Sequence, residues 1–239
     1  LGRLRREMPV ACPVMTTWSS LSTSLRITMR TVDSLARTVV GHLPGGLGHV
    51  NVVVSMLFAG ISGSSTAETA GVGGVLIPAM KKQGFDARFT AALTACASVM
   101  GVIIPPSILM VVWGGVISVS IGALFLAGVL PGILVGLSLM VVVVIYARLR
   151  NYPIYPRASL AEFLSALVQA LLPLATPMII VGGIVGGFFT ATEASVVAVL
   201  YALFLGALVY RTVGLREIPK VLYESARFAA ISLFCIGTA

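Results

Sequence analysis

The residues best suited to chemistry in this chain of 239 residues are the small and hydroxyl-bearing ones of residues 59–70, AGISGSSTAETA. Apolar segments flank them, residues 47–58 and 71–80, and each supplies roughly half of the about 20 residues that a helix needs to cross a bilayer. Two short arms around a polar tip predict a re-entrant helical hairpin over residues 47–80, with the tip near mid-membrane. Such a tip brings free N–H and free C=O groups of helix ends together, which suits ion and carboxylate binding. The first hypothesis is therefore a transporter.

A second chemical feature is the sequence GVIIPPS at residues 101–107, in the centre of an apolar segment at residues 89–113. Pro105 and Pro106 each lack a backbone N–H and clash with the preceding helical turn. A single proline kink is the simpler interpretation. The double proline beside Gly101 and Ser107 favours a true break, which would free several carbonyl groups in mid-membrane.

The composition indicates which class of protein carries these features. The chain is 58% hydrophobic and 10% charged, with a mean hydropathy of +1.04, whereas soluble domains carry about 25% charged residues. This predicts an all-α polytopic membrane protein. The net charge of +8 comes from basic residues in short loops, where it sets orientation in the bilayer and does not indicate nucleic-acid binding. Phosphate-binding loops, zinc-protease motifs and nucleophile elbows are all missing from the sequence, so we do not expect an enzyme.

The elements that must position the two features follow from hydropathy. Residues 29–42 predict an amphipathic surface helix with Val32, Leu35, Val39 and Val40 on one face. Further membrane spans are expected over residues 121–147, 164–187 and 194–210. Residues 211–227 are basic and amphipathic, and residues 228–239 supply only about half a span, so we expect the chain to be a fragment. Residues 1–28 form a separate segment that matches no element of the predicted fold.

The basic residues also predict an orientation. Residues 30–42, 81–88, 148–157 and 211–227 carry nearly all Lys and Arg, which places these segments on the cytoplasmic side. This arrangement works only if residues 47–80 enter and leave the membrane through the same face. The charge pattern therefore supports the hairpin independently of its tip.

Two acidic residues have alternative interpretations. Glu68, just after the tip, is expected either to tune cation affinity or to stabilise the start of the second hairpin arm. The segment Thr190–Glu193 resembles the tip chemically, so a second re-entrant tip is one interpretation of it. Its flanking arms are long enough to span, however, and the charge rule places it outside, where Thr192 or Glu193 would cap a helix.

Several ordered motifs resemble one known family. They are GGL from Gly45, GISGSS from Gly60, IPAMKKQGF from Ile77, IPPS from Ile104 and FTATEA from Phe189. From about residue 32 to residue 239, the chain resembles the large membrane subunit of tripartite ATP-independent periplasmic (TRAP) transporters. The resemblance implies an inverted-repeat fold of the ion-transporter type. Residues 29–147 would hold the transport elements of the first repeat, and residues 148–239 the start of an incomplete second repeat.

The same resemblance implies sodium-driven import of a small carboxylate, such as a dicarboxylate or sialic acid, across the bacterial inner membrane. Its partners would be a periplasmic substrate-binding protein and a small membrane subunit. The resemblance places one Na⁺ site at Ser62, Gly63, Ser64, Ser65, Ile103, Ile104 and Pro105. Candidates on the substrate side are Thr66, Glu68, Pro106 and Ser107. Hydroxyl and carbonyl oxygens suit a hard cation, and a site without a charged group avoids the cost of an intramembrane charge.

Other functions stay open on the sequence. A non-transporting membrane scaffold and a sodium/carboxylate symporter of the wider ion-transporter group are the main alternatives. A channel is a third, as is an intramembrane hydrolase that uses Ser64 or Ser65. The hydrolase would need a base beside the serine, and His49 lies at the entrance of the hairpin instead of at its tip.

Overall fold

The computed structural model describes residues 31–150, 152, 159–211 and 218–237, and within them every regular element is a helix. The chain divides into two compact units, Thr28–Tyr201 and one that includes Ala202–Ala239. The first unit contains both features singled out above and is described first. The predicted segment of residues 1–28, Arg30 and most of the predicted loop at residues 148–157 lie outside the described residues.

The predicted helical hairpin is present as α2 (Gly46–Ser62) and α3 (Ser65–Lys82). Gly63 ends α2 in the left-handed conformation, with φ 61°, which glycine adopts without steric cost. Ser64 is extended and caps α3, because its hydroxyl accepts a hydrogen bond from Ala67 N at 3.5 Å. The non-helical part of the tip is therefore only two residues long, shorter than the polar run in the sequence.

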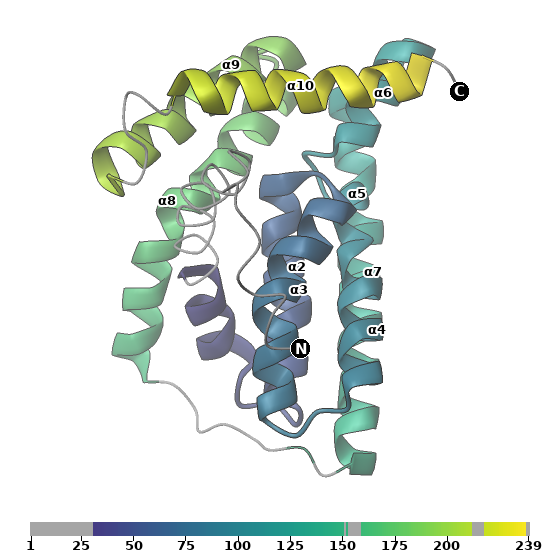
Figure 1. Ribbon diagram of the computed structural model, residues 1–239, viewed down its shortest axis with the longest axis vertical. Coiled ribbons are helices and arrows are strands. Elements are labelled where there is room, and N and C mark those ends of the chain that lie inside the picture. The colour runs from purple at the N-terminus through teal and green to yellow at the C-terminus, as the bar shows by residue number, and fades with distance from the viewer. Residues whose placement is uncertain (1–30, 151, 153–158, 212–217, 238–239) are drawn as a thin grey trace, which may run out of the picture. The chain divides into compact units, whose positions relative to one another are not determined.

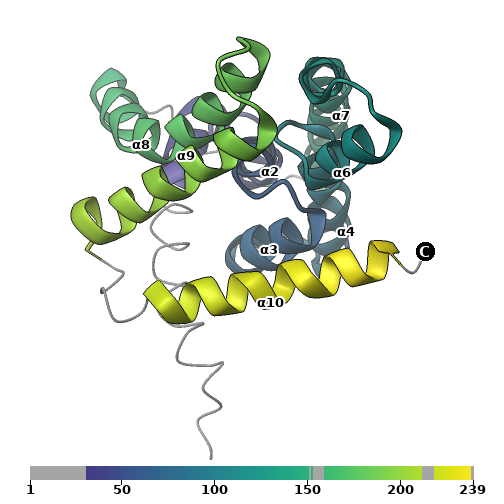
Figure 2. The ribbon, with the colours of Figure 1, turned by 90° about the horizontal axis from the view of Figure 1, so that it is seen from above.

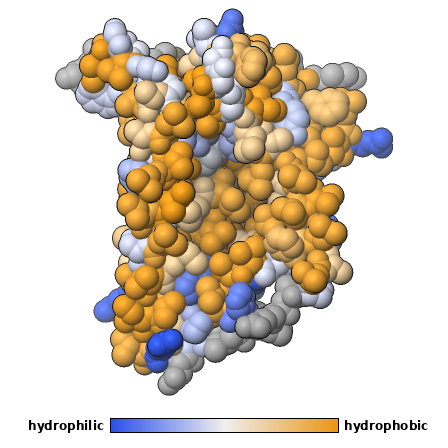
Figure 3. Space-filling view, turned by 180° about the vertical axis from the view of Figure 1, so that it is seen from behind, coloured by the Kyte–Doolittle hydropathy of each residue, from blue (hydrophilic) through white to orange (hydrophobic). Residues whose placement is uncertain are grey.

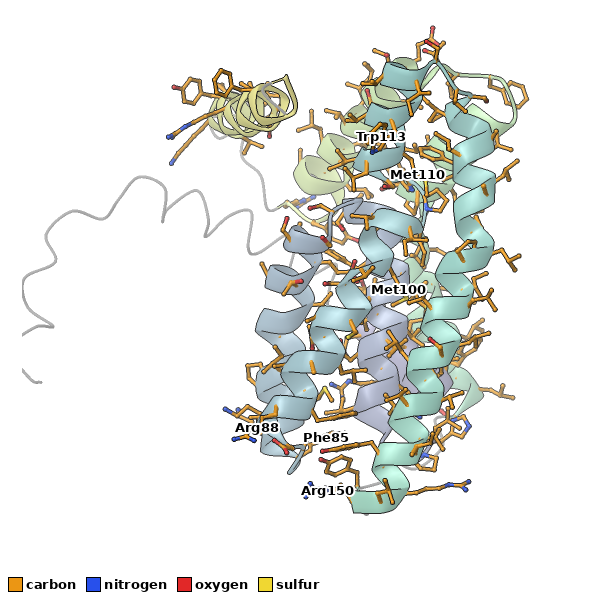
Figure 4. The ribbon with its side chains drawn as sticks, turned by 90° about the vertical axis from the view of Figure 1, so that its right-hand side faces the viewer. Phe85, Arg88, Met100, Met110, Trp113 and Arg150 are labelled. Carbon is orange, nitrogen blue, oxygen red and sulfur yellow. The ribbon has the colours of Figure 1, made fainter. Side chains whose placement is uncertain are left out.

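Both outer ends of this hairpin lie at the C-terminal end of α7 (Ile121–Arg150). Gly45, just before α2, lies against Ala147, where an added Cβ would be 2.7 Å from the Ala147 side chain. Phe85, just after α3, stacks on Tyr152 with ring centroids 4.0 Å apart. Figure 4 shows Phe85, Arg88 and Arg150 together at the lower end of this unit, with Met100 and Trp113 farther up. The two basic segments that adjoin this hairpin and α7 thus lie at one end, as the charge pattern predicted.

The predicted break divides one long helical segment into three parts. These are α4 (Ala87–Ser98), α5 (Met100–Ile103) and α6 (Ile108–Ile117). Ile104 is extended, and Ser107 caps α6 by accepting from Met110 N at 3.5 Å. The Ser107 hydroxyl also donates to Val102 O at 2.8 Å, which links the two sides of the break. The segment is therefore truly interrupted, and the simpler kink is wrong.

Helix α2 is at the centre of this unit (Figures 1 and 2) and packs against α3, α4, α5, α7 and α8 (Leu160–Val185). Most of its residues are buried, which is typical of a helix that is apolar all round. Val50, Val54 and Phe58 belong to the main core cluster. A smaller cluster joins Leu35 to Ala166 and Ala170 of α8. The hairpin is thus enclosed by protein on several sides.

Among the described residues, four helical segments are long and apolar enough to cross a membrane: Ala87–Ile117, Ile121–Arg150, Leu160–Val185 and Ala191–Val209. Their outer faces expose large apolar side chains, including Trp113 and Leu130. Figure 3 shows an extensive apolar surface on the face opposite to that of Figure 1. The chain is a multi-pass membrane protein, as its composition predicted.

The segment Thr190–Glu193 is the start of α9 (Ala191–Phe204), directly after the short turn that follows α8. The Thr190 hydroxyl accepts from Glu193 N at 3.3 Å, and Glu193 Oε2 accepts from Thr190 N at 2.8 Å. This reciprocal pair is a capping box. The helix-capping interpretation is confirmed for Glu193, but its partner is Thr190 and not Thr192.

Three details differ from the sequence-based expectations. Residues 31–40 are helical, but Val39 is 45% exposed, because the elements that bury Val32, Ala36 and Val40 leave it uncovered. Helix α7 continues to Arg150 and takes in the start of the predicted basic loop, whose Arg and Leu residues favour helix. In the second unit, a short π-helix, Leu205–Val209, follows α9. There α10 (Ile218–Gly237) unites the end of the predicted basic segment with most of the predicted half-span.

Candidate functional site

The hairpin tip and the helix break contact each other directly. Gly63 O accepts a hydrogen bond from Ile108 N, the first residue of α6, at 3.3 Å. A Cβ on Gly63 would lie 2.7 Å from Pro106 O, and a Cβ on Gly60 would lie 3.7 Å from Pro105 O. The expected meeting of the tip with the broken helix is therefore confirmed, and glycine is what allows the two backbones to approach so closely.

The hydroxyl groups of the tip bond to one another and to the backbone of the tip. Ser64 Oγ lies 3.0 Å from Thr66 Oγ1, and Ser62 Oγ accepts from Ser64 N at 3.4 Å. The Ser65 carbonyl accepts from Thr69 Oγ1 at 2.8 Å. These groups form a compact set of neutral oxygens at the end of two helices, and oxygen is the ligand that hard cations prefer.

The break presents some of the predicted carbonyl groups to the tip and turns another away. The carbonyls of Pro105 and Pro106 face Gly60 and Gly63. The carbonyl of Ile103 instead faces Gly128 of α7, where an added Cβ would collide with it, and the side chain of Ile104 packs on Gly132. Sequence reasoning assigned Pro106 to the substrate, but its carbonyl is the one nearest the tip.

A cavity of about 380 Å³ lies beside this contact. Its wall is mainly apolar, and its polar side chains are Ser62 of α2, Ser107 of the break, and Thr192 and Ser195 of α9. Sequence reasoning missed Ser195 and gave Thr192 only a capping role. The two are three residues apart and so share one helix face. This spacing could have identified both as members of one polar patch. Mainly apolar cavities of this size with a few polar side chains are typical of small-molecule binding sites.

A different environment lies on the other side of the tip. Glu68 in α3 is fully buried, and neither of its carboxylate oxygens has a hydrogen-bond partner. Gly101 of α5 lies directly against Glu68 Oε2, so that a Cβ there would collide with it. Glu68 is in the first turn of α3, but Ser64 provides the hydrogen-bonded cap. Glu68 does not line the cavity.

A second polar group inside the unit ties three helices together. Asn51 Nδ2 of α2 donates to Thr94 Oγ1 of α4 at 2.8 Å and contacts Met80 Sδ of α3 at 3.6 Å. All three residues are buried, and we interpret this group as structural. Within the described part of the chain, His, Cys, Asp and Glu residues form no cluster of three or more that would hold a metal ion.

Comparison with known proteins agrees with these features. Residues 19–239 match the family described as "Tripartite ATP-independent periplasmic transporter, DctM component". This match begins earlier than the resemblance read from motifs. The chain is 43% identical, over 96% of its length, to the C4-dicarboxylate TRAP transporter large permease protein DctM of Pseudomonas aeruginosa. It is 41% identical, over 97% of its length, to the sialic acid TRAP transporter large permease protein SiaM of Vibrio cholerae.

A further relative is the 2,3-diketo-L-gulonate TRAP transporter large permease protein YiaN of Escherichia coli. It is 37% identical over 89% of the chain and is covered over 50% of its own length. The chain covers 54% of each of the other two relatives. It therefore spans about half the length of the curated relatives it matches.

Proposed function

The chain belongs to the DctM family of tripartite ATP-independent periplasmic transporters, and from this premise we propose that it forms part of a permease that imports small carboxylates across the bacterial inner membrane. The relatives are named for a C4-dicarboxylate, sialic acid and 2,3-diketo-L-gulonate, and all three are carboxylates at neutral pH. We further propose that a periplasmic binding protein delivers the substrate and that a small membrane subunit completes the complex.

We propose that a sodium gradient drives this import and that one Na⁺ binds at the hairpin tip. The observation that carries the proposal is the direct contact of the tip with the break, which gathers neutral hydroxyl and carbonyl oxygens. The ligand candidates are Ser62, Gly63, Ser64, Ser65, Ile104 and Pro105, together with Ile103, whose carbonyl would have to turn from α7.

The charge of the cavity supports coupling to a cation. None of the residues that line it is charged, so the wall itself offers no positive group to a carboxylate. A cation at the adjoining tip would supply that charge, and substrate and ion would then favour each other's binding. Pro106 and Ser107, which line the cavity, and Thr66, beside the tip, are our candidates for substrate contact.

We also propose that the hairpin is re-entrant and opens to the cytoplasm. Ile104 at the break packs on Gly132, which lies near the middle of the 30-residue α7. Because α7 is long enough to cross the bilayer, this contact supports a tip at mid-membrane depth. Both hairpin ends lie at the end of α7 that carries Arg148 and Arg150, the side that the positive-inside rule makes cytoplasmic.

Sodium dependence of uptake tests the proposed function. The full-length permease with its small subunit would be reconstituted in vesicles, and substrate uptake with binding protein would be measured against sodium concentration. We expect Ser64→Ala and Ser65→Ala to raise the half-saturating sodium concentration, because each removes an oxygen from the ligand set. Each should lower folding stability by only about 1 kcal/mol.

The matched control is Ser138→Ala, an exposed serine on α7 whose hydroxyl donates only to Val135 O of its own helix. It should leave the sodium dependence unchanged. If both tip variants keep the parental half-saturation and Hill slope, their hydroxyls are not ligands and only backbone carbonyls remain as candidates. If the wild-type complex takes up no substrate at any sodium concentration, the scaffold alternative is favoured instead.

A further inference from the structure

The most unusual buried group in the first unit is the Glu68 carboxylate. Its side chain has no exposed surface, and neither oxygen accepts or donates a hydrogen bond. Buried charges are normally paired or bound to an ion, because transfer of an unpaired carboxylate out of water is very unfavourable. An ionised carboxylate at this position therefore calls for a positively charged partner.

No basic side chain of the helices packed against α3 is in a position to be that partner. Those helices are α2, α4 and α5. Within their described ranges α5 has no titratable residue, α4 has only Arg88 and Cys96, and α2 has only His49. Arg88 is 13 residues before Gly101, and Lys81 is 13 residues after Glu68 on α3 itself. Either distance corresponds to about 20 Å along a helix.

His49 is similarly remote from the carboxylate. It is six residues before Ser55 on α2, or about 9 Å along the axis, and its ring nitrogens have no hydrogen-bond partner. Arg37 and Asp33 form the ion pair found among the described residues, and Glu68 has no part in it. Among the described residues of α3 and the helices packed against it, no basic side chain is thus placed to neutralise Glu68.

Two oxygen atoms, by contrast, lie near this carboxylate. One is the hydroxyl of Ser55 of α2, which is fully buried, forms no hydrogen bond of good geometry and neighbours the Glu68 carboxyl. The backbone of Ser64 is close as well. A Cβ on Gly101 would collide with Glu68 Oε2 and would also lie 3.3 Å from Ser64 O. The Ser64 carbonyl accepts one bond from Glu68 N and keeps a second lone pair.

We propose that Glu68, Ser55 and the Ser64 carbonyl bind a monovalent cation behind the hairpin tip. This site shares Ser64 with the one at the tip but lies away from the cavity, because Glu68, Ser55 and Gly101 do not line the cavity, whereas Ser62 and Gly63 do. A carboxylate, a hydroxyl and a carbonyl are the oxygen ligands that a hard cation takes. The identity of the ion as Na⁺ rests on the proposed function.

This assignment gives the two sites different electrical roles. One carboxylate and one monovalent cation leave the inner site neutral when it is loaded, which removes the cost of the buried charge. The cation at the tip would meet no counter-charge among the residues that line the cavity and is left to attract the substrate carboxylate. The inner cation would hold α2 and α3 together and so order the tip that the second cation needs.

Sodium-dependent thermal stability of the purified full-length permease tests the inner site without reference to transport. The melting temperature would be measured against NaCl concentration, with choline chloride holding the ionic strength constant. We expect Glu68→Gln, which keeps the shape and removes the charge, to raise the half-saturating sodium concentration about tenfold or more. Ser55→Ala should shift it in the same direction by a smaller factor. The Hill slope of sodium-dependent uptake should also fall in the Glu68→Gln variant.

Glu162→Gln is the matched control, since Glu162 is also in the first turn of a helix but is exposed. Glutamine still closes a capping box there, so the sodium response should be unchanged. An unchanged half-saturation and slope in Glu68→Gln would overturn the inner site. If the Glu68→Gln variant does not fold, Ser55→Ala provides the test. A parental sodium response in Ser55→Ala would then overturn the inner site.

The two proposals fail in different ways. If wild-type uptake is independent of sodium while NaCl still stabilises the protein through Glu68, sodium coupling is wrong and the inner site stands. If uptake depends on sodium and on Ser64 or Ser65 but not on Glu68 or Ser55, the inner site is wrong and the proposed function stands.

Discussion

Substitution of Gly63 by alanine is the sharpest test of the contact between tip and break. Gly63 has a φ of 61°, and its Cα faces the Pro106 carbonyl, which an added Cβ would approach to 2.7 Å. The conformation alone costs an L-residue about 1–2 kcal/mol. The overlap is with backbone and cannot be relieved by a side-chain rotation, so overpacking adds about 1–3 kcal/mol. We therefore expect Gly63→Ala to lower the free energy of unfolding by roughly 2–5 kcal/mol.

Gly84→Ala separates the two contributions. Gly84 also has a positive φ, of 85°, but an added Cβ would meet no atom within 4 Å. It should show only the conformational cost of about 1–2 kcal/mol. The free energy of unfolding of each purified full-length variant would be measured by SDS titration in mixed micelles. Equal values for the two variants would refute the close approach of Gly63 to the Pro106 carbonyl.

Two further predictions follow from the cap and from the ends of the hairpin. Thr190→Ala should lower the free energy of unfolding by about 1 kcal/mol, because it removes the cap of α9, whereas Thr192→Ala should change it little. Both variants would be measured by SDS titration, and equal losses would contradict the assignment of Thr190 as the cap. In a protein without native cysteines, His42→Cys and Gln83→Cys should react with an impermeant thiol reagent from the cytoplasmic side, and Val119→Cys from the opposite side. Labelling of the first two from opposite sides would rule out a re-entrant hairpin.

Much of the helical framework was predictable because its signals are local. The half-length of the two apolar arms and the Gly63–Ser64 pair indicate a hairpin without reference to the rest of the chain. Pro105 and Pro106 interrupt a helix wherever they occur. The meeting of these two features was also predicted, and the hydrogen bond from Ile108 N to Gly63 O confirms it.

The chemistry around the tip depended on tertiary structure. The order of the residues does not say which way each carbonyl turns after a break, because that depends on the backbone angles of Ile104 and on the glycines of α7 packed against it. For this reason the Ile103 carbonyl faces α7, and the Pro106 carbonyl faces the tip. The share of α8 and α9 in the cavity is likewise a long-range property, since the chain reaches them only after α7.

Glu68 shows most clearly which properties follow from the sequence and which depend on tertiary structure. Its place in the first turn of a helix follows from the sequence, and in isolation that position suggests favourable interaction with the helix dipole. Its burial arises because α2, α4 and α5 close over α3 from distant parts of the chain. Sequence alone therefore determined that an acid follows the tip, whereas tertiary packing removed it from water and left its carboxylate oxygens without a hydrogen-bond partner among the described residues.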